Sequence, residues 1–142
     1  MEKSYMKKKN KKEALRWILQ SEKDLDDAKF NLSGSRYNVA CFLAQQSGEK
    51  ALKAYLYRKS TRSVWGHSVA DLCDRAVKYD RSFESLFSVA GPLDMYYIPT
   101  RYPDGIPEGI PSNAFMEEDA KHAIEMAEEI ADFIKSKENF LK

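Results

Sequence analysis

The chain has 142 residues, the size of one domain, and a domain of this length buries roughly two thirds of its unfolded surface. Its hydrophobic content of 43% excludes a wholly disordered chain, and no apolar run approaches the roughly 20 residues that a membrane span needs. The net charge of +1 excludes the global positive field that drives nonspecific nucleic-acid binding. Cys41 and Cys73 have no metal-ligand or redox spacing, so we expect buried reduced thiols and neither a metal site nor a cofactor.

The first twelve residues are basic, with lysines at positions 7, 8, 9, 11 and 12. They lack the apolar stretch of a secretory signal, which makes the cytoplasm the expected location. The lysines could contact phosphates, but no aromatic residue interleaves with them to stack on bases. We therefore expect residues 1–12 to form a solvated, poorly ordered tail in front of a helical domain at 13–142.

Small and apolar residues then recur at alternating spacings of four and three, which is the pattern of one helix face. They are Ala14, Ile18, Ser21, Leu25, Ala28 and Leu32. The stretch "SGSR" ends this first helix, and a second helix is predicted from Tyr37 to Arg58. Within it Ala40, Ala44 and Gly48 lie one turn apart, so another helix backbone can approach closely.

The opposite side of the second helix is polar and carries Gln45, Gln46, Glu49, Lys50 and Lys53. Glu49 and Lys53 have the spacing of an i,i+4 ion pair. From the spacing alone this side is a solvated surface with a salt bridge. The alternative is that Gln46, Lys50 and Lys53 form the floor of a pocket.

Three further elements follow. A third helix begins near Ser68, whose hydroxyl can cap it, and a fourth is predicted from Phe83 to Tyr97 with a break or kink at Gly91 and Pro92. A proline-rich loop at 98–112 precedes a last long helix that Ser112 or Asn113 can cap. The sequence thus predicts an all-α fold, an antiparallel up-and-down bundle of four to five helices.

The loop has the composition of a binding segment rather than of a linker. Tyr97, Arg101, Tyr102 and Asp104 offer a stacking face, a planar fork for phosphate and an acceptor for ribose hydroxyls. Its regularly spaced prolines stiffen it, which lowers the cost of ordering on binding. The competing interpretation is a structural cover, with Tyr102 filling a groove and Arg101 paired to a carboxylate such as Asp104 or Glu49.

The order of these motifs resembles the HEPN family of small helical domains. The stretches that carry the resemblance are "WILQSEKDLDDAKFNL", "YNVACFLAQQSGEKALKAYL", "GHSVADL", "YIPTRYPD" and "EDAKHAIEMA", within residues 13 to 137. The resemblance implies a helical bundle, usually dimeric, that acts in nucleotide or RNA transactions. Stand-alone members of this kind accompany a minimal nucleotidyltransferase in toxin-antitoxin pairs, and many members are metal-independent endoribonucleases.

Those ribonucleases carry an arginine followed after four to six residues by a histidine, near the start of the last long helix. Here Arg101 lies in the matching loop, but the positions at that spacing include Ile106 and Pro107 and no histidine. Arg62 and His67 match the spacing formally, at a place where the family has a structural turn. We therefore assign no catalytic residue and expect a binding module rather than an enzyme, with an endoribonuclease of unconventional site as the alternative.

The expected ligand is a nucleotide or RNA, and the candidate binding residues are Lys50, Lys53, Gln46, Tyr97, Arg101, Tyr102, Asp104 and His67. His67 has a second interpretation, in which it only orders the start of the third helix. His122 is expected to be a partly buried structural residue. A homodimer is expected to use large apolar residues that fall off the main helix stripes, namely Trp17, Phe30, Phe42 and Tyr57.

Overall fold

The computed structural model describes residues 2–60 and 62–141, and this part of the chain contains helices and no strand. The α-helices are α1 (Glu2–Ser33), α2 (Tyr37–Lys59), α3 (Val69–Val77), α4 (Phe87–Asp94), α5 (Pro111–Ala114) and α6 (Glu117–Lys135). Two 3-10 helices join them, η1 (Arg81–Leu86) and η2 (Pro103–Gly105). The predicted all-α helical bundle is confirmed.

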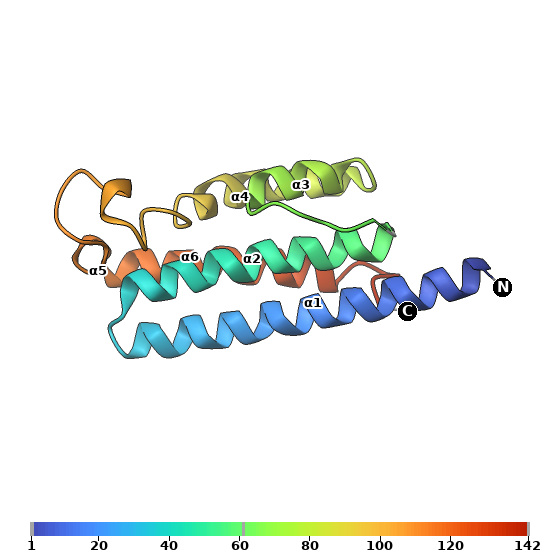
Figure 1. Ribbon diagram of the computed structural model, residues 1–142, viewed down its shortest axis with the longest axis horizontal. Helices are drawn as coiled ribbons and strands as arrows, with labels where there is room; N and C mark the ends of the chain where they lie inside the picture. Colours follow the sequence, from blue (N-terminus) through green and yellow to red (C-terminus); the bar gives the residue numbers. More distant parts are fainter. Residues whose placement is uncertain (1, 61, 142) are drawn as a thin grey trace.

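The long helices α1 and α2 form an antiparallel hairpin, and α6 lies behind α2 in Figure 1 and packs against both. Helices α3 and α4 cover the upper side, while the proline-rich loop and α5 close one end. The core between them is built from small and aliphatic side chains of α1, α2 and α6 and from Phe83 and Leu93 of the covering layer. At the opposite end the first turns of α1 project beyond the other helices (Figure 1).

Ser47 and Gly48 determine how α2 packs against its neighbours. The hydroxyl of Ser21 donates to the Ser47 carbonyl oxygen at 2.7 Å, and the Ser47 hydroxyl donates to the Ser21 carbonyl oxygen at 2.8 Å. On another side, a Cβ added to Gly48 would lie 2.7 Å from Leu93 Cδ2 and 3.4 Å from Ile130 Cδ1. The glycine therefore makes room for side chains of α4 and α6, rather than for the helix backbone that we expected.

Several boundaries differ from the sequence prediction. α1 begins at Glu2, so the lysine-rich segment is helical and not a poorly ordered tail, because lysine favours helices and neither glycine nor proline interrupts it. The fourth segment divides into η1 and α4 and ends at Asp94. Pro111 starts the separate short helix α5, so α6 begins only at Glu117.

The caps explain where two of these helices start. Ser68 caps α3 by accepting a hydrogen bond from the Asp71 amide, as predicted. Ser112 and Asn113 do not cap α6, because they lie inside α5; the carboxylate of Asp119 accepts from the Met116 amide at 2.8 Å instead.

His122 lies exposed on α6 and not partly buried. Among the described residues no helix is long and apolar enough to cross a bilayer.

Candidate functional site

Arg101 lies on a platform of aromatic rings. Its guanidinium carbon is 4.3 Å from the ring centroid of Phe42, 4.6 Å from that of Tyr97 and 5.1 Å from that of Tyr102. Its Nε donates to the Tyr97 carbonyl oxygen at 2.9 Å. In the described part of the chain no carboxylate pairs with Arg101, so its two terminal amino groups remain available on an exposed side chain. This arrangement holds the Arg101 guanidinium in one orientation and leaves its positive charge unpaired.

His67 stacks on one ring of this platform. Its imidazole lies 5.4 Å from the Tyr97 ring centroid, with the planes inclined by 16°. Its Nδ1 lies 3.3 Å from Glu49 Oε1, while its side chain remains 62% exposed. Tyr97 thus contacts an arginine and a histidine at once, and Glu49 sets the orientation of the imidazole.

The chain positions these rings through one capping aspartate. Asp94, at the end of α4, accepts hydrogen bonds from the Val69 amide at 2.6 Å, the Ala70 amide at 2.9 Å and the Ser68 hydroxyl at 2.8 Å. Because a carboxylate at a helix N-terminus satisfies free amides and the helix dipole, this contact ties the start of α3 to the end of α4. His67 and Tyr97, which flank the contact, are brought together by it.

The loop is held against α2 on its other side. Asn38 Nδ2 donates to the Thr100 carbonyl oxygen at 3.1 Å, and the buried Thr100 hydroxyl donates to the Tyr96 carbonyl oxygen at 2.6 Å. Both bonds fix the residue that precedes Arg101. The arginine therefore starts from an ordered backbone, and holding it in place costs little further entropy on binding.

The polar side of α2 is not the solvated surface that its spacing predicted. Glu49 and Lys53 form a buried ion pair at 3.2 Å, with side chains only 3% and 7% exposed. The ammonium of Lys53 lies 5.3 Å from the Trp17 ring centroid, so α1 covers it. Gln45 is fully buried and donates to the His67 carbonyl oxygen at 2.9 Å. These groups support the site from below, and Lys53 is not accessible to a ligand.

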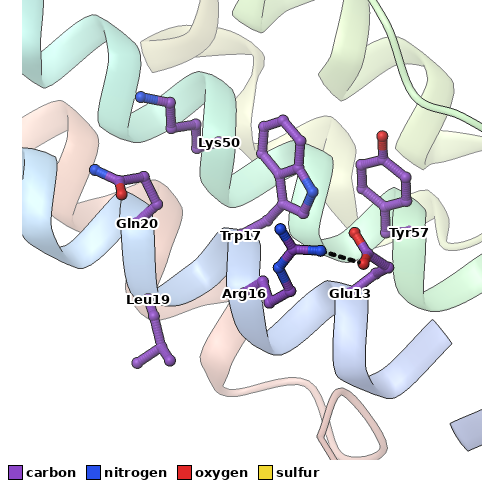
Figure 2. Close-up of a pocket in the computed structure, with 7 residues that line it drawn as sticks. All are labelled: Glu13, Arg16, Trp17, Leu19, Gln20, Lys50 and Tyr57. Carbon is purple, nitrogen blue, oxygen red and sulfur yellow. Dashed lines mark hydrogen bonds and ion pairs between the residues drawn. The ribbon is translucent and has the colours of Figure 1, made fainter. Parts of the chain in front are cut away.

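Lys50 lies on the α1 side of the bundle, in a groove of about 620 Å³ that Figure 2 shows. It pairs with the buried Asp24 of α1, which offsets its charge. Trp17 and Tyr57 stack in the same groove with centroids 5.3 Å apart, and Arg16 pairs with Glu13 at 2.7 Å (Figure 2). The structure therefore separates Lys50 from Arg101, which we expected in one site.

Of the other predicted site residues, Tyr102 contacts Arg101, Gln46 bonds within α2 and Asp104 stays exposed. Tyr102 is 49% exposed and touches Arg101, so it does not fill a groove as the cover interpretation required. Gln46 is half-buried and donates to Gln45 and Glu49. Asp104 is exposed in η2, and no ion pair joins it to Arg101 or to another described residue.

Open grooves border the platform at His67 and at Arg101. One of about 480 Å³ is lined by His67, Ser68, Asp94 and Tyr97 together with the residues that follow it. Another of about 370 Å³ is lined by Phe42, Arg101 and residues of the loop and α5. A ligand bound here could meet the imidazole in one groove and the guanidinium in the other, with the Tyr97 ring in contact with both groups.

The described residues give little support for a metal site, a reactive thiol or an Arg62/His67 pair. They contain no group of three or more His, Cys, Asp or Glu side chains arranged for a metal ion. Burial raises the pKa of the Cys41 thiol to about 12 and that of Cys73 to about 11. Arg62 lines a different groove from His67, beside Tyr79 and Lys78, so the formal Arg62/His67 spacing does not place the two in one pocket.

Sequence reasoning missed Phe42, Glu49 and Asp94 as parts of this site. Phe42 lies one turn before Gln46 on the same helix face, and that spacing could have indicated it. The i,i+4 spacing predicts Glu49 in a solvated surface pair, since local spacing does not reveal which element covers a helix face. Asp94 contacts residues that are distant in sequence, so no local signal identifies its role.

The fold and the site together define a small helical-bundle domain with an arginine held on an aromatic platform. The chain belongs to the HEPN domain family, whose model matches residues 14–137. It is similar to TT1696 from Thermus thermophilus, at 37% identity over 86% of this chain and 95% of that one, with a TM-score of 0.79.

Two further solved structures are similar. An archaeal HEPN homologue, ST0689, is 36% identical over 86% of this chain and 94% of its own, with a TM-score of 0.71. The HEPN domain protein TM0613 from Thermotoga maritima is 31% identical over 83% and 92%, with a TM-score of 0.64. A comparison with curated proteins finds no match.

Proposed function

We propose that the protein is a nucleotide- or RNA-binding HEPN module whose anionic ligand binds at the platform of Tyr97, Arg101, Tyr102 and His67. The observation that carries this proposal is Arg101, which three aromatic rings hold in place and which no described carboxylate neutralises. Phosphate is the partner that a preorganised, unpaired guanidinium fork suits best. Tyrosine faces beside it suit a base.

The proposed site is smaller than the sequence indicated. Lys53 is buried with Glu49, and Lys50 is paired with Asp24 in another groove, so neither contributes a free charge to the platform. The ligand would therefore depend on a single bidentate contact and on stacking. Such a site discriminates by the presence of a phosphate and a planar base rather than by overall charge.

The family membership supports a role beside a second protein. We propose that the domain acts in the cytoplasm with a minimal nucleotidyltransferase, as one half of a toxin-antitoxin-type pair, and that the nucleotide site takes part in that transaction. Co-purification of the two chains tests this partnership. Intact-mass spectrometry of both chains then shows whether either one gains or loses a nucleotidyl group.

One observation favours a second candidate, a metal-independent endoribonuclease. His67 has Nδ1 directed at Glu49, 3.3 Å away, and stacks on the ring that Arg101 also contacts. An imidazole oriented by a carboxylate, next to an arginine, is an arrangement that can move a proton and hold a phosphate. RNA cleavage that survives EDTA and depends on His67 would support this candidate over the first.

A thermal-shift screen tests the proposed function directly. Ribonucleoside mono-, di- and triphosphates of the four bases are added in turn to the purified chain. A ligand that binds the folded state raises the melting temperature in a concentration-dependent way. The proposal expects at least one nucleotide to do so and the corresponding nucleosides, which lack phosphate, to have a smaller effect.

A further inference from the structure

The part of the proline-rich loop around Ile106, Pro107 and Glu108 lines a groove that is separate from the proposed nucleotide site. This groove, of about 650 Å³, lies between the end of α4, the loop and the start of α6. Its apolar lining includes Met95, Ile106, Pro107 and Phe115, and its charged residues are Glu108 and Asp119. No basic residue lines it. We call it the acidic groove.

Residues next to the acidic groove extend both its apolar surface and its negative charge. Met95 is 71% exposed and Met116 is 68% exposed, so the apolar surface continues past its edges. Glu118 follows on α6, and neither Glu118 nor Glu108 forms an ion pair with a described residue. An apolar floor with the unpaired carboxylate of Glu108 in its lining, and with Glu118 next in sequence to the lining residue Asp119, suits a partner that brings an apolar side chain flanked by lysines.

The chain itself carries such a segment in the N-terminal arm, which we define as residues 2–12. The arm holds six of the 23 basic residues but only one of the 22 acidic ones, so the rest of the chain has more acidic than basic residues. Its first turns project beyond the bundle in Figure 1, and none of its lysines pairs with a described residue.

The arm has two different faces. Tyr5, Lys8, Lys9 and Lys12 follow the i, i+3, i+4, i+7 spacing that places side chains on one side of a helix, and Tyr5 is 66% exposed. The remaining lysines, at positions 3, 7 and 11, share the opposite side. The first face thus presents one aromatic anchor with three lysines beside it.

The arm cannot reach the acidic groove of its own chain. The two lie at opposite ends of the molecule (Figure 1), and the part of α1 that follows the arm, residues 13–33, alone spans about 32 Å between them. A contact between them must therefore join two copies. An antiparallel pair related by a two-fold axis would satisfy both arms and both grooves at once, and would close the assembly.

We infer that the N-terminal arm of one copy docks in the acidic groove of a second copy, with Tyr5 on the apolar floor and Lys8 and Lys12 facing Glu108 and Glu118. The assembly is held by charge as well as by apolar contact. It therefore weakens as the salt concentration rises from about 0.05 M to about 0.5 M, because salt screens exposed charges.

Sedimentation velocity on the full chain tests this inference, with matched charge reversals on the two faces of the arm. Lys8→Glu with Lys12→Glu should raise the dissociation constant of the dimer about tenfold or more, since like charges then face each other. Lys7→Glu with Lys11→Glu makes the same change of net charge on the opposite face and should have a clearly smaller effect. Tyr5→Ala should also weaken the dimer.

A charge swap completes the test. Adding Glu108→Lys to the Lys8→Glu, Lys12→Glu variant should recover part of the lost affinity, whereas Glu108→Lys alone should weaken association. Equal effects of the two arm faces, a monomer at all concentrations, or a swap that weakens association further would each overturn the inference. A zero-length cross-link between Lys8 and Glu108 in mixed light and heavy protein provides the second measurement, and it is expected only between copies.

Discussion

The imidazole of His67 lies 5.4 Å from the ring centroid of Tyr97, with an angle of 16° between the two planes. Arg101 contacts the same tyrosine ring at 4.6 Å. An imidazole from the segment before α3 and a guanidinium from the loop thus both contact the ring of Tyr97, which follows α4. Their proximity depends on Asp94, which caps α3 from the end of α4.

The buried ion pair beneath this site predicts a large stability effect. Lys53→Met would leave the carboxylate of Glu49, which is only 3% exposed, without its ammonium partner. Breaking one side of a buried pair costs about 3 to 5 kcal/mol when the remaining charge is left uncompensated. Glu49 would keep the Gln46 amide and the exposed imidazole of His67 as partners, so we expect a loss toward the lower end of that range. Chemical denaturation of the variant measures this cost as a lower midpoint.

Matched variants separate burial from simple charge pairing. Asp27→Asn breaks the exposed Lys23–Asp27 pair at the same i,i+4 spacing and should change the unfolding free energy by less than about 1 kcal/mol. The double variant Lys53→Met, Glu49→Gln should be more stable than the Lys53→Met single variant. Equal small losses at both pairs would show that the Glu49–Lys53 pair is not desolvated.

For RNA cleavage we predict a negative result. Purified protein should leave single-stranded RNA intact in EDTA, because no histidine follows Arg101 at the family spacing and Arg62 lies away from His67. Gel analysis of labelled RNA is sufficient to check this. Cleavage that is lost in His67→Ala, with an unchanged melting temperature, would instead establish the His67–Glu49 arrangement as catalytic.

Asp80 predicts a specific acid dependence of stability. Hydrogen bonds from the Ser82 side chain, then from Lys137 and the Ser82 amide, lower the pKa of Asp80 from 3.8 to about 2. A carboxyl whose folded pKa is depressed contributes stability that is present above about pH 4 and is lost as the pH falls toward 2. Because the side chain is 32% exposed, solvent screening limits the contribution to about 1 kcal/mol.

The comparison of wild type with Asp80→Asn checks this assignment. Their unfolding free energies should differ by about 1 kcal/mol at pH 6 and converge as the pH falls to about 2, where the wild-type carboxyl takes up its proton. A difference that stays constant over this range would mean that Asp80 stabilises the fold by its shape and not by its charge.

The two thiols should be inert in the folded protein. Burial raises the pKa of Cys41 to about 12 and of Cys73 to about 11, so very little thiolate exists near neutral pH. Iodoacetamide at pH 8 should therefore modify neither cysteine in the native state and both in denaturant, as measured by intact-mass spectrometry. Rapid native modification of either residue would show that its helix opens locally.

The helices followed from the sequence because their signals are local. The stripe from Ala14 to Leu32 and the Ser68 cap need only neighbouring residues, and both are present as predicted. The start of α6 was wrong because Pro111 begins a short helix of its own. Choosing between two adjacent starts depends on how the loop packs, which no short window of sequence contains.

The site was predicted less well than the fold. Tyr97, Arg101, Tyr102 and His67 are brought together, as their residue types indicated. Lys50 and Lys53 are not part of this cluster, because α1 covers the polar side of α2 and supplies Asp24 and Trp17 as partners. A helix face reveals its polarity in sequence, but only tertiary packing decides whether it meets solvent.

The expected dimer residues illustrate the same limit. Trp17 and Tyr57 stack on each other, and Phe42 lies beneath Arg101, so these rings already have partners within the chain. Phe30 is 77% exposed and is the member of this set that remains most open to solvent. A single aromatic contact row is therefore absent from the described residues, and the homodimer itself stays a prediction.

The central claim is that Arg101 holds the phosphate of a nucleotide, and calorimetric titration of Arg101→Ala tests it most directly. The nucleotide that gives the largest thermal shift is titrated into wild type, Arg101→Ala and the control Arg81→Ala, which removes the same charge at an exposed site paired with Glu84. We predict a loss of about 1.5 to 3 kcal/mol, or ten- to a hundredfold in affinity, for Arg101→Ala and no comparable loss for Arg81→Ala. Unchanged affinity of Arg101→Ala together with a lowered melting temperature would contradict the claim and identify the loop as a structural cover.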